Sequence, residues 1–334
     1  MQLTPELLQQ FAERTVDQLV QADPSIIAAY QCGSTLLDET PLLGGTTDID
    51  IVIIHTAEPA IQREILRLTD DVHLDISHHN QDLYRHGREL RVRPWMGPTL
   101  NSARPIHDPR HFLDFTQASV RGLFGRDDYT EQRAQTLYDR AREAWFGLEA
   151  DTPTPAPMLV SSYMKVVENA ANSLALLVGE PLTERRFMLG FSRCAQAHGE
   201  PLMVNGLLGL LGGHRVDVEQ IQSWLADWSQ AYDAIPEEAR PVRLHPYRKD
   251  YYQKAFDALI DSDEPKAVLW PLLNTWTLAA STFSVGSPSY QGWHDACQQL
   301  ELIASDLSER MAALDAFLDQ VEETISKWVP DIGY

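Results

Sequence analysis

The sequence predicts two parts with different folds: an α/β (α+β) domain with a small mixed sheet over residues 1–125, and an all-helical domain over 126–334. In the first part, short Ile- and Val-rich runs alternate with helical segments, as in α/β folds. From about residue 128 onward, apolar residues recur at helical spacing, which is typical of helical bundles. The length of 334 residues suffices for two domains, on a prior of ~100–200 residues for each.

The first domain is expected to begin with a helix followed by a strand. Thr4-Pro5-Glu6 supplies a capping residue, a proline at the first helical position and an early acid, the usual start of a helix. Asp23-Pro24 ends this helix, since proline disfavours helical geometry in the residue before it. Ile26 to Tyr30 is then predicted as a strand.

The next segments continue the alternation of elements. Gly33 to Asp38 is predicted as a turn into a short helix, and Pro41 to Thr47 as a loop. Asp48 to His55 is the clearest strand, because it is rich in Ile and Val. A helix is expected over Pro59 to Leu68 and a further strand over Val72 to Ser77.

Within the second domain, a proline-rich linker is expected at Asp151 to Pro157. Helices are expected at roughly 158–178, 183–198, 216–232, 247–262, 265–283, 289–304 and 307–328.

The last expected helix has apolar residues that alternate in four- and three-residue steps, which is a heptad seam. The seam consists of Leu307, Met311, Leu314, Leu318, Val321, Ile325 and Trp328. Two interpretations are open: the seam packs within the helical domain, or it forms a homodimer contact with a second copy of the chain.

Composition narrows the classes of partner. The chain has 27 basic and 48 acidic residues, a net charge of −21. Such a surface repels nucleic acids and anionic membranes, so nucleic acid is disfavoured, although a local basic patch can oppose the global sign. Cys32, Cys194 and Cys297 fit neither a disulfide framework nor a zinc site. Without a signal-like leader or an apolar run approaching ~20 residues, the expected location is the cytoplasm.

Three aspartates are the strongest candidates for a functional site. Asp48 and Asp50 are one residue apart on a predicted strand, so their side chains share a face, with Cβ atoms about 6–7 Å apart. Asp75 lies mid-strand between Leu74 and Ile76. If the two strands are neighbours, the carboxylates form one cluster whose oxygens suit Mg²⁺ or Mn²⁺. The structural alternative is a strand-capping Asp48, an edge Asp50 and a solvated Asp75.

Together with Gly33-Ser34, this pattern resembles the signature of the polymerase-β-type nucleotidyltransferase superfamily. That signature is a strand, Gly-Ser and a short helix, then a hydrophobic Asp-x-Asp strand, here Asp48-Ile49-Asp50, and a third acidic strand, here with Asp75. The resemblance covers roughly residues 26–77. Thr46-Thr47 stands where many members carry Ser, and the spacing from Gly-Ser to Asp-x-Asp is long for the family.

The resemblance implies a nucleotidyltransferase domain and a role for each residue of the motif. Asp48 and Asp50 would hold the metal bound to a nucleoside triphosphate, while Gly33, Ser34 and nearby backbone amides hold its phosphates. Asp75 would help to bind a second metal and to activate the acceptor hydroxyl. Two metals would stabilise the attacking and leaving oxygens of an in-line displacement.

The two-domain layout resembles that of aminoglycoside-type nucleotidyltransferases. In two-domain members of the superfamily the helical domain can supply a lysine to the phosphates or a glutamate base to the acceptor. Lys165 and Glu168 are candidates because residues three apart share a helix face; a plain surface ion pair is the alternative. Whether Asp75 or Glu168 is the general base is left open.

The expected function is that of a transferase which moves an NMP, expected to be AMP from ATP, to a hydroxyl of a small-molecule acceptor and releases pyrophosphate. The acidic surface favours a small molecule or a protein over nucleic acid as acceptor. One alternative is a protein- or tRNA-modifying nucleotidyltransferase of a toxin–antitoxin or defence type. Another is a non-catalytic nucleotide-binding module.

Two further motifs suggest cofactor chemistry that their context does not support. His55, His73, His78 and His79 gather at strand ends, but no cysteine accompanies them and their spacing is irregular, so a structural role is expected. Gly206-x-x-Gly209-x-x-Gly212 follows no strand, unlike a dinucleotide-binding loop. We expect these glycines to mark close helix packing or a turn.

Overall fold

The computed structural model describes residues 4–36, 42–149, 154–303 and 308–328, and the structural statements below concern these residues. The chain divides into two compact units, Met1–Thr130 and Glu131–Tyr334. The division falls within a helix, α5 (Asp127–Glu149). Of the expected proline-rich linker, residues 151–153 lie outside the described residues, and Pro155 directly precedes the next helix.

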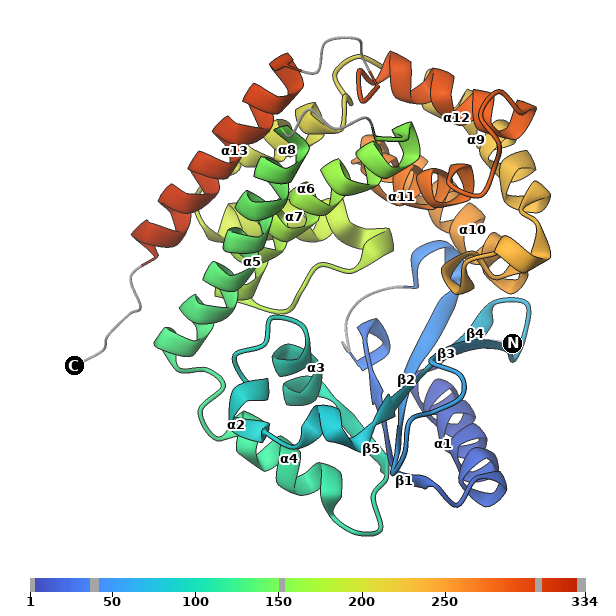
Figure 1. The fold of residues 1–334 in the computed structure, drawn as a ribbon, viewed down its shortest axis with the longest axis vertical. Coiled ribbons are helices and arrows are strands. Elements are labelled where there is room, and N and C mark those ends of the chain that lie inside the picture. Colours follow the sequence, from blue (N-terminus) through green and yellow to red (C-terminus); the bar gives the residue numbers. More distant parts are fainter. Residues whose placement is uncertain (1–3, 37–41, 150–153, 304–307, 329–334) are drawn as a thin grey trace. The chain divides into compact units, whose positions relative to one another are not determined.

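The first unit contains a five-stranded mixed sheet and short helices (Figure 1). The strand order is β3-β4-β2-β1-β5; β2 and β4 run parallel, and the other neighbours are antiparallel. The expected small mixed sheet is therefore present. Its elements are α1 (Pro5–Ala22), β1 (Ile26–Cys32), η1 (Ser34–Leu36), η2 (Leu43–Gly45), β2 (Thr47–His55), β3 (Arg63–Arg67), β4 (Val72–Asn80), η3 (Gln81–Tyr84), α2 (Gly87–Leu90), α3 (Met96–Ser102), β5 (Arg104–His107) and α4 (Phe112–Arg121).

Helices cover both faces of this sheet, with α1 on one side and α2 to α4 on the other (Figure 1). Alternation along β2 assigns its side chains to the two faces. Ile49, Ile51 and Ile53 are buried beneath α1, whereas Val52 and Ile54 pack with α2 to α4. Even-numbered β2 residues, including both aspartates of Asp-x-Asp, therefore belong to the α2–α4 face.

The helix expected over Pro59 to Leu68 is wrong, because part of this segment forms strand β3. Its residues pair with β4 in an antiparallel hairpin, with Leu66 opposite Leu74. Thr69 stabilises the turn, since its Oγ1 accepts hydrogen bonds from the N–H groups of Asp71 and Val72 at 3.2 and 3.1 Å. Cross-strand pairing thus outweighs the weak helical preference of a short segment.

The second unit is helical throughout its described residues, as expected for this part of the chain. Helix α6 lies at its centre and contacts α7, α11 and α13. The helices that follow α5 are α6 (Ala156–Val178), α7 (Phe187–Ala197), α8 (Met203–Leu210), α9 (Val218–Ala234), α10 (Lys249–Ile260), α11 (Leu269–Ala280), α12 (Pro288–Gln299) and α13 (Ser308–Lys327). No described helix of the chain is long and apolar enough to cross a membrane.

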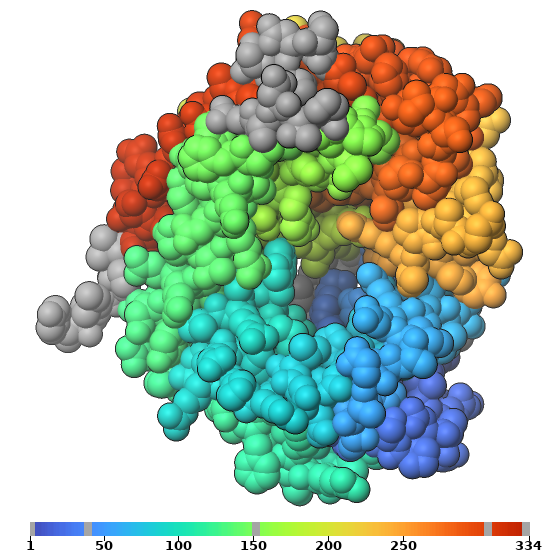
Figure 2. Space-filling view, in the orientation of Figure 1, coloured from blue at the N-terminus to red at the C-terminus, as the bar shows by residue number. Residues whose placement is uncertain are grey.

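The heptad seam lies inside this unit. Leu314, Leu318, Val321 and Ile325 are buried, and α13 packs against α6 and α8. Its opposite side carries exposed polar residues and lies at the surface (Figure 2, red). Packing within the unit therefore accounts for these seam positions without a second copy of the chain. Leu307, the first seam residue, lies outside the described residues.

Of the spaced glycines, Gly212 marks a turn, which is one of the two features expected of them. Gly206 lies in α8, where an added Cβ would stand 3.5 Å from the Phe317 ring of α13. Gly212 follows the helix in a turn with a φ of +73°, and an added Cβ there would lie 2.3 Å from the carbonyl oxygen of Leu300. A Cβ at the first position would make an ordinary van der Waals contact, whereas the second position requires glycine for its backbone conformation and for this close approach.

Candidate functional site

The parallel pairing of β2 and β4 brings the three candidate aspartates together. In this register Asp50 lies beside Asp75, and Asp48 lies beside His73. One carboxylate oxygen from each aspartate lies within 4.8 Å of the other two. Asp48 and Asp75 are only 6% and 3% exposed, and Asp50 is partly buried. Three carboxylates therefore converge on one point at the sheet surface, with two of them nearly removed from water.

The three carboxylates could together hold a divalent metal ion. Two like charges ~4 Å apart repel by on the order of 4 kcal/mol at an effective dielectric of 20. A bound cation reverses the sign of this term, and carboxylate oxygens are ligands that Mg²⁺ and Mn²⁺ prefer. Asp48, Asp50 and Asp75 are the residues that would hold the ion.

The turn at Gly33 lies directly beside the side chain of Asp50. Gly33 follows β1 and ends the extended backbone, with a φ of +81°. The 3-10 helix η1 begins at the next residue, Ser34, and packs against β1 and β2. A Cβ added at Gly33 would lie 2.0 Å from Oδ2 of Asp50. Only glycine permits both this φ and this approach. The Gly-Ser turn and the Asp-x-Asp strand, thirteen residues apart, are therefore in direct contact.

An arginine that the sequence did not place at this site is paired with Asp75. Arg63 of β3 donates from Nε to Oδ1 of Asp75 at 2.6 Å and from Nη2 to Oδ2 at 2.5 Å. A helix over this segment gives no reason to place Arg63 near Asp75. Had the segment been predicted as a strand antiparallel to β4, Arg63 would have been diagonal to Asp75 on the same face, within reach of a long side chain.

The neighbouring thiol has little tendency to act as a ligand. Cys32 of β1 pairs with Asp50 across the sheet. Burial, together with the negative charges of Asp50 and Asp75, raises the pKa of the Cys32 thiol well above its usual range. Because only the thiolate is an effective metal ligand, the cluster offers hard oxygen donors, consistent with Mg²⁺ or Mn²⁺.

Two of the four histidines form a hydrogen-bonded row on the α1 face. Nδ1 of His55 lies 3.0 Å from Oγ of Ser25, and its Nε2 lies 2.9 Å from Nδ1 of His78. Nε2 of His78 lies 3.1 Å from Oε1 of Glu64. All three contacts are satisfied with both rings neutral when Ser25 donates to His55, His55 to His78, and His78 to Glu64. The row therefore connects the residue that precedes β1 with β2, β4 and β3.

Stability should fall in mild acid, because burial, followed by the charge of His78, lowers the pKa of His55 despite the opposing effect of Asp23. Burial likewise lowers the pKa of His79. Below the unfolded value of about 6.5 the unfolded chain binds more protons than the folded one, so stability rises with pH through this window. Urea unfolding at pH 7.5 and 5.5 should show a lower free energy of unfolding at pH 5.5. The decrease should be smaller in His55→Gln; an equal decrease in both proteins would contradict this role of His55.

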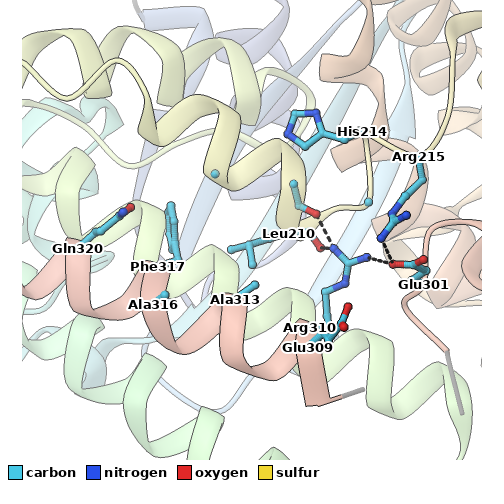
Figure 3. A pocket seen from close by; sticks show the side chains of 13 residues that line it. Leu210, His214, Arg215, Glu301, Glu309, Arg310, Ala313, Ala316, Phe317 and Gln320 are labelled. Carbon is cyan, nitrogen blue, oxygen red and sulfur yellow. Dashed lines mark hydrogen bonds and ion pairs between the residues drawn. The ribbon is translucent and has the colours of Figure 1, made fainter. Parts of the chain in front are cut away.

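The helical unit contains a cavity of about 870 Å³ between α8 and α13 (Figure 3). Its arginines are engaged in structural contacts. Arg310 donates to the carbonyl oxygens of Gly209 and Leu210 in the last turn of α8, and to that of Leu300 at the end of α12. Arg215 pairs with Glu301 at 3.1 Å. Arg310 thus satisfies carbonyl groups that helix ends leave open, and the cavity is a weaker site candidate than the aspartates.

Lys165 lies in the second unit, on α6. Its Nζ is 2.6 Å from Oε2 of Glu168, one turn further along the helix. The Lys165 side chain is exposed, at 55%, whereas that of Glu168 is half-buried, at 33%. This is the surface ion pair that their spacing allowed, and a pair of this kind contributes little to stability.

Comparison with known proteins found no match. No protein-family model matches the chain, and no curated protein matches it.

Proposed function

We propose that this protein is a metal-dependent nucleotidyltransferase that transfers an NMP, expected to be AMP from ATP, to a hydroxyl of a small-molecule acceptor and releases pyrophosphate. One observation carries the proposal: the register of β2 and β4 brings Asp48, Asp50 and Asp75 within 4.8 Å of one another. The contact between Gly33 and Asp50 supports it, because the resemblance assigns the phosphates to this turn.

Each residue of the cluster has a role in this proposal. Asp48 and Asp50 would hold the ion that carries the triphosphate, and Ser34 with the backbone of η1 would contact its phosphates. When bound, Mg²⁺ neutralises the charge that develops on the transferred phosphoryl group and on the pyrophosphate leaving group. Asp75 would orient the acceptor hydroxyl and receive its proton as the oxygen attacks the α-phosphorus.

The net charge of the chain favours some classes of acceptor over others. A net charge of −21 opposes the approach of tRNA and other polyanions. A small molecule is therefore the favoured acceptor, and a protein is the next choice.

The proposal is tested by label transfer. The protein is incubated with Mg²⁺ and ATP labelled at its α-phosphate, in the presence of a small-metabolite extract, denatured protein or tRNA in separate reactions. We expect label in the small-molecule fraction, with stoichiometric pyrophosphate release that EDTA abolishes. Label in protein or tRNA would favour the modifying-enzyme alternative. Mg-ATP binding without pyrophosphate release from any of the four nucleoside triphosphates would overturn the proposal in favour of a non-catalytic module.

A further inference from the structure

The pairing of Asp75 with Arg63 creates a conflict inside the proposed metal site. Both carboxylate oxygens of Asp75 accept hydrogen bonds from one guanidinium, at 2.6 and 2.5 Å. A bidentate pair of this geometry is among the stronger side-chain contacts. The same two oxygens are those through which Asp75 would approach a divalent cation.

The two partners differ strongly in their access to solvent. The Asp75 side chain is 3% exposed and held within the sheet, whereas the Arg63 side chain is 40% exposed at the edge strand β3. The carboxylate is therefore the fixed partner, and the arginine can move away. Burial of an ionised carboxylate is costly unless a cation accompanies it, and a bound metal ion would supply the positive charge that Arg63 now supplies to Asp75.

The space into which Arg63 can move adjoins the site. A pocket of about 640 Å³ on the first unit is lined by Arg63 together with Ser77, His79 and Glu58. Ser77 is the residue opposite Arg63 in the β3–β4 pair. The carboxylate of Glu58 offers the guanidinium a second acidic partner within the same pocket.

We propose that Arg63 is an exchangeable counter-ion: it neutralises Asp75 in the metal-free protein and withdraws into the adjacent pocket when Asp75 binds a divalent cation. Arg63 is thus a positioning residue that sets the affinity of the site for metal. This inference rests on the metal site of the proposed function, but it concerns binding and requires no turnover.

The test is direct Mn²⁺ binding, measured by electron paramagnetic resonance on the full-length protein. Arg63→Gln should bind Mn²⁺ about tenfold more tightly than the wild type, because the metal no longer competes with a guanidinium. The same variant should melt at a lower temperature than the wild type in EDTA, and Mn²⁺ should restore its stability. Arg63→Lys, which keeps the charge but loses the bidentate geometry, should bind Mn²⁺ with an intermediate affinity.

Arg67→Gln is the matched control, because Arg67 lies on the same strand and forms an ion pair with the exposed Asp70. It makes the same change of charge, and its Mn²⁺ affinity should stay at the wild-type value. Equal or weaker Mn²⁺ binding by folded Arg63→Gln, with normal binding by the wild type, would overturn the exchange and leave the proposed function intact. Absence of Mn²⁺ binding in every protein would overturn the metal site, and with it both proposals.

Discussion

Asp50→Asn should abolish metal-dependent nucleotidyl transfer while the chain stays folded. Asp50 lies between the Gly33 turn and Asp75. Asparagine keeps the shape of its side chain but removes the negative charge that would hold the proposed cation. Loss of one preorganised electrostatic contact in an active site typically costs ~10²–10³ in rate, and we expect at least that loss here. Asp48→Asn should behave in the same way, because it supplies the other carboxylate of the Asp-x-Asp strand.

The loss of activity in these variants should not be accompanied by a loss of stability. Each substitution removes one of three clustered negative charges, so metal-free Asp48→Asn and Asp50→Asn should melt no lower than the wild type in EDTA. Mn²⁺ should raise the melting temperature of the wild type but not that of the variants. Asp70→Asn, on the exposed β3–β4 turn, is the control and should keep full activity. Unchanged pyrophosphate release in both site variants would contradict the assigned roles.

The sequence alone predicted the acidic cluster because strand geometry leaves few choices. The apolar residues of β2 and β4 identify both strands, and alternation along β2 places Asp48 and Asp50 on one face. Once the two strands are neighbours, Asp75 joins them. In the second unit, helical periodicity identified Leu314 and Leu318 as part of an apolar seam. It left open whether the seam packs within the unit or against a second copy, and the structure buries both residues within the unit.

The features that the sequence did not predict depend on tertiary pairing. The segment around Arg63 has no strong local preference, and it becomes a strand only because β4 offers a partner. The Arg63–Asp75 ion pair was missed for the same reason. The contact between Gly33 and Asp50 depends on the register of β1 against β2. The Gly-Ser motif predicted a phosphate-binding turn, but not that this turn contacts a carboxylate of the acidic cluster.

Gly33→Ala should disable the site through steric contact with Asp50. The substitution places a Cβ 2.0 Å from Oδ2 of Asp50, at a residue whose φ is +81°. Either the carboxylate or the turn must move, and we expect a loss of Mn²⁺ affinity and of nucleotidyl transfer of at least about 100-fold, as for the removal of an active-site contact. The free energy of unfolding should decrease by roughly 2–4 kcal/mol, which combines left-handed backbone strain with overpacking.

A control substitution at a second glycine distinguishes the backbone strain from the steric contact with Asp50. Gly45 also has a positive φ, +69°, but a Cβ added there meets no heavy atom of the described residues within 4 Å. Gly45→Ala should therefore show the backbone cost alone, about 1–2 kcal/mol, and keep its affinity for Mn²⁺. Equal effects of the two substitutions on metal binding would refute the steric account.

The contact itself can be isolated by a double-mutant cycle. In an Asp50→Ala background the Oδ2 atom is gone, so adding Gly33→Ala should cost little more than Gly45→Ala costs in the wild type. The coupling energy from urea unfolding of the four proteins then measures the overlap between the turn and the carboxylate. A coupling energy near zero would mean that Gly33 is required for its backbone conformation alone. A large one would show that the space for the Asp50 carboxylate exists because position 33 has no side chain.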